Sequence, residues 1–152
     1  MVIRLLIFLG LNFVALAIGG MFTGSGVSSE WYASLNKAPW TPPGWVFGAA
    51  WTFLMICFGF YLAWLWPKLE NKTLLIGLYS LQWVLNVGWN PVFFYFQNTN
   101  LGLLVISALT LLCVFLLVFY WPELKSKSLF ILPYVLWLLI ATSLNAFISL
   151  NN

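Results

Sequence analysis

Long apolar runs separated by short polar segments dominate this chain. Its six Lys or Arg and three Asp or Glu residues leave uncharged stretches at 5–29, 38–67, 73–122 and 128–152. A membrane-spanning helix needs about 20 apolar residues. The polar segment 97–100 divides the longest stretch, so the pattern predicts spans near 4–22, 44–66, 73–96, 101–121 and 128–149. We therefore expect an all-α integral membrane protein, a five-transmembrane-helix bundle in which residues 1–152 form a single domain.

The first apolar run has two interpretations. Arg4, the apolar run and Ala15-Leu16-Ala17 are typical of a signal peptide, in which case residues 1–17 would be removed. The run, however, continues to Phe22 with no polar cleavage region. This favours a retained first span.

The connection between the first two runs is rich in aromatic residues and proline. Residues 31–51 contain four Trp and three Pro residues. Proline is poorly tolerated inside a helix but is favoured at its first turn. We therefore expect a structured first loop at 23–43, with Pro42-Pro43 leading into a helix at Gly44.

The charges predict the orientation of the bundle. With five spans, one side of the membrane receives all but one of the basic residues: Arg4, Lys68, Lys72, Lys125 and Lys127. Lys37 lies on the other side. The positive-inside rule then places the N-terminus in the cytoplasm and the first loop outside. Because this asymmetry accounts for the net charge of +3, the sequence indicates no nucleic-acid partner.

The sequence lacks the residues that several kinds of chemistry require. The chain has no histidine, and no charged residue falls inside a predicted span. Proton-coupled transport and conventional acid–base catalysis both depend on such groups. Cys57 and Cys113 fall inside spans, where we expect packing rather than a disulfide or a metal site. We expect no metal and no bound cofactor.

Neutral polar and aromatic residues follow one face of three predicted helices. The faces carry Phe47, Trp51, Leu54 and Phe58; Tyr79, Gln82, Asn86 and Asn90; and Tyr134, Trp137, Ala141 and Asn145. Amides in hydrocarbon need partners, so these faces should turn into the bundle. The polar residues could either join helices or line a binding site. For Gln82 and Asn145 we give these two roles equal weight. Asn86 and Asn90, which lie beside Trp89, favour a site.

Three motifs resemble those of the TspO/MBR family, which includes the translocator proteins and peripheral-type benzodiazepine receptors. The first runs from Trp31-Tyr32 through Trp40-Thr41-Pro42-Pro43-Gly44 to Trp51; the second is Leu78-Tyr79, Gln82, Leu85-Asn86, Trp89 and Phe93-Phe94; the third is Pro133-Tyr134, Trp137, Ala141-Thr142 and Leu144-Asn145. They occur in the family's order and span residues 31–149.

The resemblance implies a ligand pocket roofed by the first loop, in a protein that is often a homodimer. The family's ligands include tetrapyrroles such as protoporphyrin IX, sterols and synthetic benzodiazepine-type compounds. Together with the helical faces, the resemblance implies that the ligand-binding residues are Tyr32, Pro42, Phe47, Trp51, Asn86, Trp89, Asn90, Trp137 and Ala141. A flat apolar macrocycle would suit such a pocket, and membrane lipid would be the surrounding partner.

Three functions follow from this resemblance. The first is a receptor that senses, sequesters or hands over a porphyrin. The second is light- and oxygen-dependent porphyrin degradation, for which Trp51 and Trp137 are the catalytic candidates. The third is a transporter of porphyrin or sterol, which the absence of charged residues in the spans disfavours.

Overall fold

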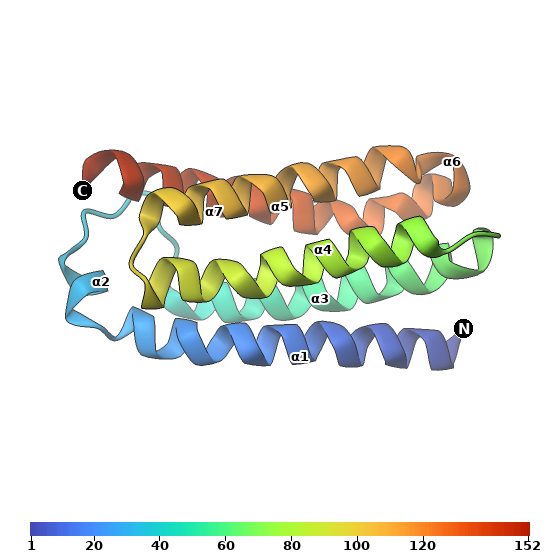
Figure 1. Ribbon diagram of the computed structural model, residues 1–152, viewed down its shortest axis with the longest axis horizontal. Helices are drawn as coiled ribbons and strands as arrows, with labels where there is room; N and C mark the ends of the chain where they lie inside the picture. The colour runs from blue at the N-terminus through green and yellow to red at the C-terminus, as the bar shows by residue number, and fades with distance from the viewer.

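The computed structural model describes residues 1–152 and is helical throughout, without strands. Its helices are α1 (Val2–Val27), α2 (Glu30–Ser34), α3 (Gly44–Leu65), α4 (Thr73–Asn90), α5 (Thr99–Phe119), α6 (Trp121–Leu124) and α7 (Leu132–Asn151). A π-helical segment, Pro91–Tyr95, extends α4, and 3-10 segments cover Trp66–Lys68 and Lys125–Ile131. The long helices lie side by side in one bundle, with α2 and the C-terminus at one end and the N-terminus at the other (Figure 1).

Four helical stretches are long and apolar enough to cross a membrane: Val2–Val27, Gly44–Lys68, Thr99–Phe119 and Trp121–Asn151. They correspond to four of the five predicted spans. The stretch predicted at 73–96 is helical but is not among them, so a count of five spans is not confirmed. The reason is its polarity, because Gln82, Asn86 and Asn90 all lie on α4.

Two predicted boundaries differ from the structure. Helix α1 continues to Val27, so the first part of the expected loop 23–43 is helical. That loop also contains α2, which begins where the Ser29 side chain accepts a hydrogen bond from the backbone N–H of Tyr32 at 3.1 Å. The last long helix begins at Leu132, since residues Lys125–Ile131 form a 3-10 segment instead. Helix α3 begins at Gly44, directly after Pro43, as predicted.

Aromatic and aliphatic side chains fill the centre of the bundle. Phe58, Tyr61 and Tyr134 are fully buried, and the rings of Phe58 and Tyr134 meet edge to face with centroids 5.5 Å apart. Cys57 and Cys113 are free and buried, which confirms the prediction that they pack in the core rather than pair.

Hydrogen bonds between neutral side chains join the helices. Gln82 Nε2 donates to the hydroxyl of Tyr134 at 2.9 Å, linking α4 to α7. On α1, Asn12 donates to the carbonyl of Met55 at 3.0 Å and accepts from the hydroxyl of Tyr79 at 2.9 Å. Gln82 therefore has the helix-joining role weighed for it. Asn12 has the same role, which its sequence context did not indicate.

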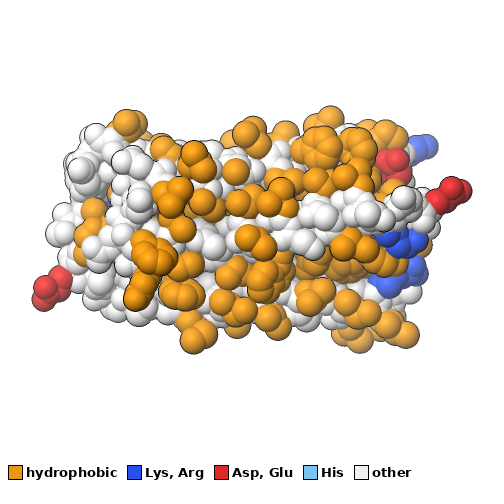
Figure 2. All heavy atoms as spheres, viewed as in Figure 1, with side chains coloured by type: hydrophobic (Ala, Val, Ile, Leu, Met, Phe, Trp, Pro, Cys, Tyr) orange, Lys and Arg blue, Asp and Glu red, His pale blue; other side chains and the backbone are white.

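The surface combines a long apolar belt with charged ends. Apolar side chains cover the length of the bundle, while Lys and Arg side chains gather at the end where α1 begins (Figure 2). Such a surface suits a protein surrounded by lipid, with its polar ends at the two interfaces. The fold is therefore that of a multi-pass membrane protein.

Candidate functional site

A cavity of about 440 Å³ lies at the end of the bundle covered by α2 and the loop that follows it. Side chains from α1, α2, α3, α4, α5 and α7 line it, together with Thr41 and Pro42 of the loop. Its volume falls within the range of about 300–1,000 Å³ that is usual for small-molecule sites.

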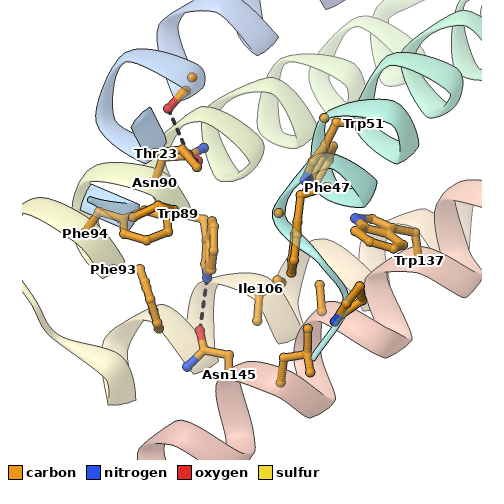
Figure 3. A pocket seen from close by; sticks show the side chains of 18 of the residues that line it. Thr23, Phe47, Trp51, Trp89, Asn90, Phe93, Phe94, Ile106, Trp137 and Asn145 are labelled. Carbon is orange, nitrogen blue, oxygen red and sulfur yellow. Dashed lines mark hydrogen bonds between the residues drawn. The ribbon is translucent and has the colours of Figure 1, made fainter. Parts of the chain in front are cut away.

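Aromatic rings form two walls of the cavity. In the close view, Trp89, Phe93 and Phe94 lie on one side, and Phe47, Trp51 and Trp137 lie on the other (Figure 3). Trp89 and Phe93 are stacked with centroids 5.1 Å apart, whereas Phe47 and Trp137 meet edge to face at 5.6 Å. The two walls leave space between them for a flat apolar molecule.

The π-helical segment shapes the first of these walls. Pro91 lacks a backbone N–H and so interrupts the regular pattern of α4. The segment turns Phe93 and Phe94 inward, where both are buried. π-Helical turns inside α-helices occur frequently at functional sites.

The roof of the cavity is attached to the bundle at two places. At one, the ring of Tyr32 packs against Phe94 at 5.6 Å, with the amino group of Lys37 lying 4.6 Å from the Tyr32 centroid. At the other, Trp40 Nε1 donates to Ser143 Oγ of α7 at 3.2 Å, and its ring meets Phe147 at 5.5 Å. Burial raises the pKa of the Tyr32 hydroxyl above its usual value, so this side chain stays neutral at physiological pH.

The polar side chains of the cavity fall into two groups. Some are fully engaged: Asn90 accepts from Thr23 Oγ1 at 2.6 Å and donates to the carbonyl of Asn86 at 3.0 Å. Asn145 accepts from Trp89 Nε1 at 3.0 Å. It therefore joins helices, which is one of the two roles considered for it from the sequence.

Two other polar groups are free. Trp137 Nε1 is buried without a hydrogen-bond partner, and the side-chain amide of Asn86 has none within the chain. A buried N–H without a partner is unusual, because leaving it unpaired costs about 1–3 kcal/mol. Asn86 lines the cavity, so a bound molecule with polar atoms could satisfy its amide, whereas Trp137 Nε1 is covered by neighbouring side chains.

The structure brings all the predicted site residues to this one cavity: Tyr32, Pro42, Phe47, Trp51, Asn86, Trp89, Asn90, Trp137 and Ala141. That they contact a ligand stays a prediction. The cavity is also lined by Gly19 and Thr23 of α1 and Ile106 of α5, which were not among the predicted site residues. The Gly19-Gly20 pair was the available signal, since small residues in an apolar helix often mark a close approach.

The chemistry available in the cavity is that of contact and hydrogen bonding. Lys37 is its one charged lining residue, and no cluster of His, Cys, Asp or Glu side chains could hold a metal ion. The aromatic walls offer stacking area, and the free amide of Asn86 offers orientation.

Fold and cavity together define a helical membrane protein with an aromatic cavity at one end. The chain belongs to the TspO/MBR family, whose family model matches residues 8–150. It is 37% identical to the tryptophan-rich protein TspO of Archaeoglobus fulgidus over 135 residues, covering 88% of this chain and 87% of that protein.

Two further relatives come from other organisms. The chain is 31% identical to the translocator protein of Homo sapiens, covering 83% of this chain and 79% of that protein. It is 35% identical to the tryptophan-rich sensory protein of Cereibacter sphaeroides, covering 76% and 73% respectively. Membership of this family supports a role as a membrane receptor or sensor.

Proposed function

We propose that the cavity binds a tetrapyrrole such as protoporphyrin IX and that the protein acts as a membrane receptor for it. The observation that carries the proposal is the pair of aromatic walls, with the free amide of Asn86 in the lining of the same cavity. A flat macrocycle would gain apolar contact with both walls. Polar groups on it would pair with the Asn86 amide.

We further propose that α4 is the fifth span and that the N-terminus is cytoplasmic. Helix α4 and its π-helical extension run continuously over 73–95, which at about 1.5 Å per residue exceeds 30 Å, the thickness of the hydrocarbon core. Gln82 and Asn86 are buried, so its amides face the bundle rather than lipid. Five spans place Arg4, Lys68, Lys72, Lys125 and Lys127 together at one end.

Quenching of tryptophan fluorescence by protoporphyrin IX tests the binding proposal. The protein has ten Trp residues, several of them in the cavity wall, so a bound porphyrin should quench saturably in detergent. We expect Trp51→Phe and Asn86→Ala to weaken binding. Trp121→Phe and Asn100→Ala change exposed residues outside the cavity and should leave the affinity unchanged.

The controls decide how the result is read. Absence of saturable quenching in the wild type, or equal effects of the cavity variants and their controls, would reject the porphyrin receptor. Sterols and lipids would then be the compounds to screen.

Light-dependent porphyrin degradation is a second candidate, supported by the position of Trp51 and Trp137 in the same wall. Indole rings close to an excited porphyrin could act as redox partners in the presence of oxygen. The prediction is that the porphyrin absorbance falls under light and not in darkness, and that the loss stops when both residues are changed to Phe. Persistence of the loss in that double variant would exclude this mechanism.

A further inference from the structure

A second concave site lies on the outside of the bundle, at the end opposite the roofed cavity. It is a groove between α1 and α4 with a volume of about 570 Å³. We call it the α1–α4 groove; its lining residues are Arg4, Ile7, Phe8, Leu11, Trp66, Leu75, Ile76, Tyr79, Ser80, Trp83 and Val84. It shares no lining residue with the aromatic cavity.

The walls of the α1–α4 groove are apolar and open to the surroundings of the bundle. Ile7, Ile76 and Val84 are 55%, 50% and 61% exposed. Trp83 closes one end, because its Nε1 donates across to the carbonyl of Leu11 at 3.1 Å. From Leu75 to Val84, α4 rises about 14 Å, close to the thickness of one leaflet of a hydrocarbon core of about 30 Å. The groove therefore has the length and the apolar character that a lipid acyl chain requires.

The other end of the groove is positively charged. Arg4 lines it from the first turn of α1, a turn that contains no acidic residue. A cation there faces the positive end of the helix macrodipole, and Met1 provides no side-chain cap for the free N–H groups. Lys72 adds a second cation, since its Nζ lies 5.7 Å from the ring centroid of Trp66, which also lines the groove. Glu70 is the one acidic residue in the connection between α3 and α4, and its side chain is exposed.

We propose that the α1–α4 groove binds one anionic phospholipid, with its phosphate at Arg4 and an acyl chain along the apolar wall. A phosphate group would complement the guanidinium and the N-terminus of α1 together. Arg4 lies in the first turn of a spanning helix, which is the depth of a lipid headgroup. A neutral lipid or a second copy of the chain would fill the groove without complementing this charge.

Native mass spectrometry of the detergent-solubilised full chain tests the proposal. The chain is titrated separately with phosphatidylglycerol and phosphatidylcholine that carry the same acyl chains. We expect one retained phosphatidylglycerol and a preference of about fivefold over phosphatidylcholine, the factor for one cation near an anionic headgroup. Arg4→Gln should remove most of this preference, with Lys72 as the one cation left at this end of the groove. Lys127→Gln removes the same charge at the same end but outside the groove, and should preserve it.

A second pair of variants tests the apolar half of the site. Ile76→Trp adds bulk inside the groove at an exposed position and should reduce retention of both lipids. Val118→Trp adds the same bulk on exposed α5, outside the groove, and should not. A thermal melt of each variant shows whether it is folded.

Four results would overturn the proposal. They are equal retention of the two lipids by the wild type, equal effects of Arg4→Gln and Lys127→Gln, unchanged phosphatidylglycerol retention in Ile76→Trp, and a lipid-free wild-type dimer that Ile76→Trp dissociates. The last result would assign the groove to a second copy of the chain.

Discussion

Trp89 of α4 donates a hydrogen bond from its indole Nε1 to Asn145 Oδ1 of α7 at 3.0 Å. The amide nitrogen of Asn145 donates in turn to the carbonyl of Thr99 at 2.8 Å, at the start of α5. One buried side chain thus connects three helices beside the aromatic cavity. The same bond orients Trp89, whose ring forms part of the cavity wall.

A double-mutant cycle should detect this coupling. Asn145→Ala leaves the Trp89 donor unpaired and should lower the free energy of unfolding by about 1–3 kcal/mol. Trp89→Phe keeps an aromatic ring beside Phe93 but removes the donor and part of the indole. We expect a coupling of about 0.6 kcal/mol, and no more than about 1.7 kcal/mol, in unfolding by sodium dodecyl sulfate. Strictly additive effects would mean that the bond contributes no stability.

Replacing Trp137 by Phe should separate binding from stability. The substitution removes a buried N–H without a partner, which favours folding, and part of a buried ring, which opposes it, so the thermal midpoint should change little. Because Trp137 lines the cavity, loss of indole contact area should lower the affinity for protoporphyrin IX about two- to tenfold. Trp64→Phe, which changes a tryptophan outside the cavity, should leave the affinity unchanged. A lower midpoint with unchanged affinity would contradict contact between Trp137 and the ligand.

Ala141 should control the space available in the cavity. It lies on the same face of α7 as Trp137 and lines the cavity, so Ala141→Leu should lower porphyrin affinity by about tenfold or more. Ala49→Leu adds the same volume at an exposed position of α3 that does not line the cavity. Equilibrium quenching titrations compare the two. Similar affinities for both variants would place the ligand elsewhere.

Close packing of α1 against the π-helical segment should make Gly26 intolerant of a side chain. A Cβ added at Gly26 would collide with the Cβ and ring of Phe94, whereas one added at Gly24 would meet nothing within 4 Å. Gly26→Ala should therefore destabilise the protein by about 1–3 kcal/mol. Gly24→Ala should be neutral or stabilising by up to about 1 kcal/mol, because alanine favours helix. Equal thermal midpoints would show that Phe94 moves aside freely.

Labelling with a membrane-impermeant maleimide tests the proposed orientation of the bundle in the membrane. The native Cys57 and Cys113 are 8% and 0% exposed, so the maleimide should not react with the wild type. Any labelling of a cysteine variant can then be assigned to the introduced cysteine. Ser34→Cys, in α2, should be labelled in intact cells. Ser126→Cys lies at the opposite end of the bundle and should react only after permeabilisation. The reverse pattern would invert the topology.

Apolar runs, charge distribution and helical faces in the sequence determined the class of the protein and the approximate limits of its helices. Those patterns are local, because burial against lipid or core sets the type of residue at each turn of a helix. One end of each predicted face therefore meets the others around one cavity, which is lined by Phe47, Trp51, Asn86, Asn90, Trp137, Ala141 and Asn145. The same patterns misplaced the end of the first helix. Residues 23–27 include polar side chains and glycines, but the helix continues through them to Val27.

Only the tertiary structure decided which polar groups are satisfied and which are free. Asn86 and Asn90 are one turn apart on α4, yet Asn90 is bonded to Thr23 and to the Asn86 carbonyl, while the amide of Asn86 is free. The difference depends on where α1 crosses α4, at Gly19, and no local pattern specifies that crossing. The α1–α4 groove likewise arises where residues 4–11 of α1 pack against residues 75–84 of α4, more than sixty positions further along the chain. Contacts of this kind depend on the whole bundle, which is why the sequence alone did not reveal them.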